Sequence, residues 1–174
     1  MQDLTANVRI PVAALNAMSR EEFVAALGEL LEGSAHLVGR AWEARPFASL
    51  GDVHGAVMDA VNNATEEEKL ALLRAQPELA DRLKAPSPTS AAEQARAGLD
   101  RMAPDEQKQF RRLNADYRHR HGFPFIICAR LNSKRTILAA FARRLRKLRH
   151  IEFQTALDQL AKIARLRLAD RVME

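Results

Sequence analysis

Titratable side chains are plentiful in this chain, but their spacing matches no general catalytic motif. The sequence holds 22 Asp and Glu residues, and most of them stand where first helical turns are expected. It contains no Gly-rich phosphate loop, no Cys/His spacing typical of zinc and no Gly-x-Ser-x-Gly nucleophile turn. These patterns predict no metal site, and alone they indicate only a soluble helical domain.

Positive charge is concentrated in residues 143–150 (Arg-Arg-Leu-Arg-Lys-Leu-Arg-His), within a chain of net charge +5 and pI about 9.9. Such a cluster can bind nucleic acid or an anionic substrate. It is more often typical of a solvated helix end, where cations interact favourably with the helix dipole. No nucleic-acid module or aromatic stacking platform accompanies the cluster, so the sequence favours the helix end.

The bulk properties indicate a globular protein, expected to form a single domain over residues 1–174. At this length a chain buries about two-thirds of its unfolded surface, and 47% of the residues are hydrophobic. No apolar run approaches the roughly 20 residues of a membrane span, and the first residues do not resemble a secretory signal. A single cysteine, Cys128, excludes an internal disulfide and fits a reducing compartment. A cytoplasmic location is therefore expected.

Helix starts can be recognised at several places. Ser/Thr-x-x-Glu capping boxes at Ser19, Thr65 and Ser90 each precede an apolar helical stripe. Pro104 is expected to open a helix that Gly122 ends. Further helices are predicted after Ser133 and over residues 35–44, 50–63 and 151–172.

Strand signal is nearly absent. Residues 122–128 are the only β-like run, and Pro124 makes them an extended connector rather than a central strand. Residues 84–89, with two prolines, are expected to form a loop between helices. The predicted fold is all-α: a single compact bundle of about seven or eight helices.

Five segments, taken in order, resemble one enzyme family. Residues 75–80 read Ala-Gln-Pro-Glu-Leu-Ala, which is similar to the His-Pro-Glu/Asp-Leu-Ala signature of the OHCU decarboxylases. Arg-Pro-Phe, Ser-x-x-Glu-Gln-x-x-Ala-Gly-Leu, Leu-Asn-x-x-Tyr…Gly-Phe-Pro-Phe-Ile and Ile-Ala-x-x-Arg-Leu elements also resemble those of the family, and they lie at 45–47, 90–99, 113–126 and 163–168.

This resemblance implies a lyase of purine metabolism and urate degradation. The family decarboxylates 2-oxo-4-hydroxy-4-carboxy-5-ureidoimidazoline to (S)-allantoin, needs no cofactor and is usually a homodimer. The implied partners are therefore the small-molecule substrate and product and a second copy of the chain, with neither membrane nor nucleic acid expected.

The resemblance also assigns site residues. Gln76 occupies the position of the family's catalytic histidine, Glu93 that of its partner carboxylate, and Arg167 that of the cation that fixes the substrate. Backbone amides near Phe125, Ile126 and Ile127 would hydrogen-bond substrate oxygens. The remaining implied substrate-binding residues, all weaker candidates, are Pro77, Ser90 and Gln94.

Each assignment has a structural alternative. Glu93 lies three residues after Ser90 and could simply complete a capping box. Arg167 lies beside an apolar seam, where a cation is either buried for a reason or extended toward solvent. Phe123 and Phe125 are expected to pack in the core while their backbone binds, and Cys128 is expected to be a small buried hydrophobe.

Gln76 is the serious departure from the family pattern, because an amide cannot exchange a proton near neutral pH as imidazole does. Three explanations remain open: an inactivating substitution, a paralogue that binds without catalysis, or another proton carrier. His121 is the first candidate carrier and His36 the second. The alternative is that His121 has no catalytic role and is simply an exposed histidine at a helix end. The function expected is thus an impaired decarboxylase, or alternatively a silent binding protein or basic nucleic-acid-binding module.

Overall fold

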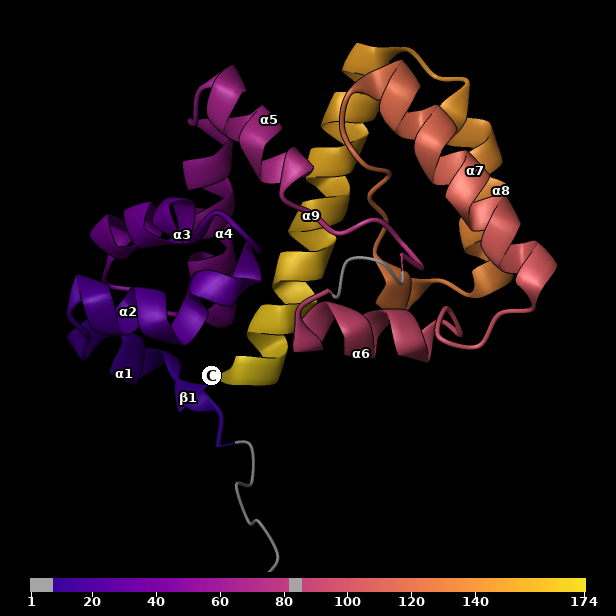
Figure 1. The fold of residues 1–174 in the computed structure, drawn as a ribbon. Helices are drawn as coiled ribbons and strands as arrows, with labels where there is room; N and C mark the ends of the chain where they lie inside the picture. The colour runs from indigo at the N-terminus through magenta and orange to yellow at the C-terminus, as the bar shows by residue number, and fades with distance from the viewer. Residues whose placement is uncertain (1–7, 82–85) are drawn as a thin grey trace, which may run out of the picture. The chain divides into compact units, whose positions relative to one another are not determined.

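The fold of this protein is all-α, as predicted. The computed structural model describes residues 8–81 and 86–174, and within these ranges it contains nine α-helices and three 3₁₀ helices (Figure 1). The only strands in these ranges are β1 (Ile10–Pro11) and β2 (Val172–Met173), which pair in parallel with Ile10 opposite Val172. Among the helices in residues 8–81 and 86–174, none combines the length and the apolar character that a membrane span requires.

The chain divides into two compact units. The described residues of the first unit are 8–72 and 161–174. In it α3 packs against α2 and α4, and Phe23 stacks on Phe47 with ring centroids 6.0 Å apart. Its elements are β1, α1 (Val12–Ala17), α2 (Arg20–Leu27), η1 (Gly28–Leu30), α3 (Ala35–Ala41), η2 (Trp42–Ala44), α4 (Leu50–Asn62), most of α5 (Glu66–Arg74), the end of α9 (Arg149–Arg171) and β2.

The second unit covers residues 73–81 and 86–160 of the described chain. Its elements are α6 (Pro88–Arg96), α7 (Pro104–His121), η3 (Ala129–Leu131), α8 (Lys134–Leu145) and the first part of α9. Helices α7 and α8 pack side by side (Figure 1). The core of this unit is a group of buried rings, called the aromatic cluster below: Phe110, Tyr117, Phe123, Phe125 and Phe141.

Most predicted helix ends are confirmed. The capping boxes at Ser19 and Thr65 form, and Ser133 caps α8 through Thr136. Pro104 opens α7, and Gly122 ends it with φ of 79°, a left-handed conformation that glycine adopts without steric cost. Residues 122–128 contain no strand, in agreement with the predicted extended connector.

The predicted start of α6 is wrong. Its N-cap is Ser87, whose Oγ accepts the backbone N–H of Ser90 at 3.1 Å, and Pro88 is the first helical residue. Ser90 therefore lies inside the helix, and Ser90 and Glu93 form no capping box. Pro88 and Thr89, expected in a loop, belong to this helix, and part of that loop lies outside the described residues.

We expect Ser87→Ala to lower the free energy of unfolding by about 1 kcal/mol, the usual cost of losing an N-cap side chain. Thr89→Ala, in the first turn of the same helix, is the matched control. Urea denaturation of both variants measures the difference. An equal loss in both would contradict the assignment of Ser87 as the cap.

Candidate active site

The segment that carries Gln76 is a turn fastened to α7. The backbone N–H of Gln76 donates to Leu73 O at 3.2 Å, and the residue is only 7% exposed. Asn114 Nδ2 donates to Leu79 O at 2.9 Å, and Arg118 Nε donates to Glu78 Oε1 at 2.7 Å. Because side chains of α7 hold this turn at two points, the placement of Gln76 depends on tertiary contacts.

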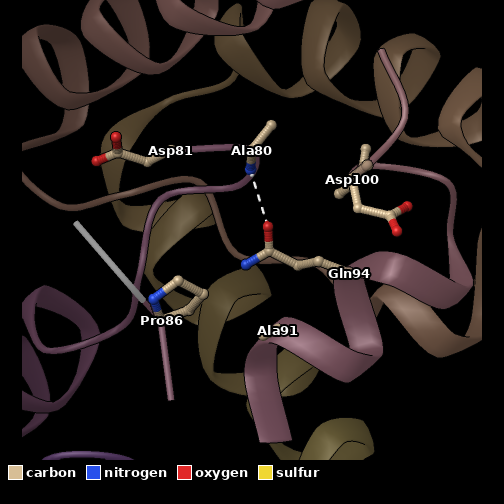
Figure 2. A pocket seen from close by; sticks show the side chains of 7 residues that line it. Ala80, Asp81, Pro86, Ala91, Gln94 and Asp100 are labelled. Carbon is tan, nitrogen blue, oxygen red and sulfur yellow. Dashed lines mark hydrogen bonds between the residues drawn. The ribbon is translucent and has the colours of Figure 1, made fainter. Parts of the chain in front are cut away.

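The turn ends in a left-handed residue that meets Gln94. Ala80 has φ of 59°, an uncommon conformation for a residue with a Cβ atom. Its N–H donates to Gln94 Oε1 at 2.9 Å, so the carboxamide of Gln94 bridges α6 to the turn (Figure 2). Ala80 and Gln94 flank a cavity of about 310 Å³. The cavity is also lined by Asp81, Pro86, Ala91, Leu99 and Asp100.

Ser90 and Glu93 lie on the buried face of α6. They are 5% and 8% exposed, and Ala97, one turn further, is buried as well. Burying a carboxylate is costly unless it forms an ion pair or a hydrogen bond. Because Glu93 is not part of a capping box, helix capping does not explain why its carboxylate is buried. Helix α6 packs against η3, and the charge of Glu93 acts on the Cys128 thiol just before η3. Burial makes the largest contribution to raising the pKa of the Cys128 thiol, and the negative charge of Glu93 raises it further.

The extended connector, residues 122–128, places its aromatic rings in the core. Phe125 stacks on Phe141 with centroids 3.8 Å apart, and Phe123 lies 6.0 Å from Tyr117. The expectation that these rings pack is confirmed. Within the described ranges, the N–H groups of Ile126 and Ile127 donate no hydrogen bond, although both residues are buried.

Sequence reasoning missed a buried ion pair beside the connector. Arg144 Nε donates to Glu152 Oε2 at 2.9 Å, and the Tyr117 hydroxyl donates to the same oxygen at 2.5 Å. Arg144 Nη1 donates to Ile126 O at 2.7 Å. Arg144 is 5% exposed, so it is not part of the solvated helix end predicted for residues 143–150. Arg144 follows Ile137 by seven residues and Phe141 by three. This helical spacing was the sequence signal that Arg144 lies on the buried face of the helix.

His121 is buried, which contradicts the expectation of an exposed helix-end histidine. It is 1% exposed, its ring lies 4.4 Å from that of Tyr117, and neither ring nitrogen has a partner in the described part of the chain. Burial lowers the pKa of His121, and the negative charge of Glu152 offsets only part of this effect. His36, by contrast, is exposed, with Nε2 3.9 Å from Glu68 Oε1.

Arg167 belongs to the first unit and is buried rather than extended toward solvent. Its side chain is 5% exposed; Nη1 donates to Glu29 O at 3.1 Å and Nη2 lies 3.9 Å from Glu32 Oε2. The other candidates, Gln76, Pro77, Ser90, Glu93, Gln94 and residues 125–127, all belong to the second unit. No group of three or more His, Cys, Asp or Glu residues in the described ranges could hold a metal ion.

The sequence model of the OHCU decarboxylase family matches residues 16–169. The chain therefore belongs to this family. It is 41% identical over 157 residues to the 2-oxo-4-hydroxy-4-carboxy-5-ureidoimidazoline decarboxylase of Haloferax volcanii, covering 90% of this chain and 93% of that one. The mouse enzyme of the same name is 37% identical over 162 residues, covering 90% and 89%.

A solved structure shares the fold. The crystal structure of (S)-allantoin synthase superposes with a TM-score of 0.75 and 27% identity over 94% of this chain. The match covers 54% of that chain, so the present protein spans about half its length. The carboxy-lyase family suggested by the five sequence segments is thus confirmed.

We expect Ala80→Gly to raise the free energy of unfolding by about 0.5 kcal/mol. A left-handed conformation costs a residue with a Cβ atom about 1–2 kcal/mol, and the greater unfolded-state entropy of glycine offsets part of that gain. Ala75→Gly, five residues earlier, is the control and should lower stability. Chemical denaturation tests both, and a loss at position 80 equal to that at position 75 would contradict the prediction.

Stability should fall in mild acid because of His121. Its pKa is lower in the folded protein than the ordinary value of about 6.5. The unfolded chain therefore binds a proton below about pH 6.5 that the folded protein does not bind. The resulting loss of stability approaches about 1.4 kcal/mol per pH unit. His121→Phe should make the free energy of unfolding less dependent on pH between 7.5 and 5.5.

Urea denaturation at several pH values measures this dependence. His119→Gln, on the exposed side of the same helix, is the matched control. An unchanged pH dependence in His121→Phe would show that another group takes up the proton.

Proposed function

We propose that this protein decarboxylates 2-oxo-4-hydroxy-4-carboxy-5-ureidoimidazoline to (S)-allantoin, in a version of the reaction slowed by Gln76. The observation that carries the proposal is the family match over residues 16–169. The curated relatives of matching length bear the name of this decarboxylase, and Glu93 is buried in α6 without a capping role.

The reaction determines what the site must provide. The carboxylate and the hydroxyl share one carbon, so the loss of CO₂ leaves the bonding electron pair on that carbon. The adjacent ring C=N group accepts this pair and forms an enediamine-type intermediate, which is then protonated on one face. The protein must orient the carboxylate, polarise or deprotonate the hydroxyl, and deliver the proton.

The polar candidates fit these tasks. We assign a role in proton transfer to Glu93, because the family pairs a carboxylate with its catalytic histidine. We assign to Arg167 the role of holding the substrate in a fixed orientation. The planar fork of a guanidinium matches carboxylate and ureido oxygens. The unpaired N–H groups of Ile126 and Ile127 support their role as donors to substrate oxygens.

The other assigned residues would shape the pocket. Gln94 Oε1 accepts the Ala80 N–H, which leaves its amide nitrogen, directed toward Pro86 in Figure 2, as a donor. Pro77 and Ser90 would line the same site as Gln76 and Glu93. The reaction uses no cofactor, as the family resemblance implies.

Gln76 limits the rate because its amide can hydrogen-bond a substrate oxygen but neither gains nor loses a proton near neutral pH, so it cannot act as a general acid or base. Loss of a general acid–base group costs about 10²–10⁴-fold. The alternative function is a binding protein that retains the pocket without turnover, and the same buried amide favours it.

By resemblance we further propose a homodimer. The single, buried Cys128 supports a reducing, cytoplasmic setting.

We expect Gln76→His to increase the rate of (S)-allantoin formation by about 10²-fold or more. The labile substrate is generated in situ from urate, and (S)-allantoin is followed by circular dichroism against the spontaneous background. Gln76→Asn, which keeps an amide, is the matched control and should not accelerate the reaction. Adding Glu93→Gln to Gln76→His should abolish the gain.

Other outcomes separate the alternatives. If the unchanged chain is already fast, the His121→Asn and His36→Asn variants identify the proton carrier. If neither the chain nor Gln76→His forms (S)-allantoin above background, the catalytic proposal is wrong. Saturable binding of (S)-allantoin would then support the binding-protein alternative, whereas steeply salt-dependent binding of nucleic acid would support a basic module.

A further inference from the structure

The peptide unit between Ile126 and Ile127 is held by a side chain rather than by secondary structure. Arg144 Nη1 donates to Ile126 O at 2.7 Å, and both residues are buried. A trans peptide is planar, and its C=O and N–H point in opposite directions. Fixing the Ile126 oxygen therefore also fixes the direction of the Ile127 N–H.

The next two peptide units are also held by side chains. In the Ile127–Cys128 unit the N–H of Cys128 donates to Gln159 Oε1 at 3.0 Å, and in the Cys128–Ala129 unit Cys128 O accepts from Asn132 Nδ2 at 2.9 Å. The N–H of Ile127 itself has no acceptor within the described ranges. Buried backbone N–H groups are rarely left unpaired in folded proteins, so a donor fixed from both sides but unused is suited to an external acceptor.

Arg144 is itself firmly held. Glu152 accepts its Nε, and the Tyr117 hydroxyl donates to the same carboxylate oxygen. Its Cζ lies 4.4 Å from the centre of the Phe125 ring, which stacks on Phe141. The guanidinium is thus fixed by charge on one side and by an aromatic face on the other, and it transmits that rigidity to the connector.

We propose that Arg144, fixed by Glu152 and Tyr117, is a positioning residue that aims the Ile127 N–H at a substrate oxygen. This inference rests on the proposed function. Arg144 contacts the connector through the Ile126 carbonyl and the Phe125 ring, and it acts on the Ile127 N–H through the shared peptide unit. The role differs from that of a core ion pair, because it predicts an effect on ligand affinity as well as on stability.

The test compares two conservative variants. Tyr117→Phe keeps the ring in the aromatic cluster and removes one hydrogen bond from Glu152. Arg144→Lys keeps the charge and loses the planar fork. Met102→Ala, a buried position outside this network, is the control for general loss of stability. Calorimetry gives the dissociation constant of (S)-allantoin for the folded fraction of each protein. The ¹⁵N and ¹H amide signals of Ile127 report the hydrogen bond on its own peptide unit.

We expect the dissociation constant to rise about 10-fold in Arg144→Lys and about 3-fold in Tyr117→Phe, the effect of misdirecting one hydrogen-bond donor. The Ile127 signal should shift in both variants. Met102→Ala should lower stability without changing either readout. Unchanged affinity in both variants would overturn the inference and leave the proposed function standing. If the unchanged chain does not bind (S)-allantoin and Gln76→His is inactive, the proposed function and this inference both fail.

Discussion

The pair formed by Arg144 and Glu152 is the interaction on which the second unit depends. Removing one partner of a buried pair leaves an uncompensated charge and costs about 3–5 kcal/mol. The structure offsets this cost with hydrogen bonds to both groups, although Arg144 Nη2 has no partner in the described part of the chain. Tyr117 donates to Glu152, the Ile126 carbonyl accepts from Arg144, and burial together with Glu152 raises the pKa of the Tyr117 hydroxyl. A charged group thereby holds an otherwise irregular stretch of backbone in the core.

Local features of the fold could be predicted from the sequence because local chemistry determines them. A Ser or Thr three residues before a Glu can satisfy two backbone donors at the start of a helix, and Ser19 and Thr65 do so here. Gly122 ends α7 because the left-handed conformation is easy only for glycine. Proline in residues 122–128 excludes a central strand. The family resemblance likewise depended on short segments whose order the chain retains.

The remaining features depend on contacts between distant residues. Two serines, Ser87 and Ser90, could each cap α6, and the choice of Ser87 places Glu93 on a buried face. Arg144 stands in a run of cations and cannot be distinguished from its neighbours without knowing that Glu152 of α9 faces it. His121 is similar, because a histidine in the last turn of a helix is normally solvated, and only the aromatic cluster buries it.

Helix α9 is continuous from Arg149 to Arg171 and supplies polar side chains to both units. Glu152 and Gln159 are seven residues apart, close to two full turns, so both face the connector side of the helix. Arg167 follows further along the same helix. Inserting or deleting one residue between Gln159 and Arg167 would rotate one set against the other by about 100°. The length of this helix, and not only its sequence, therefore determines which polar side chains face the same way.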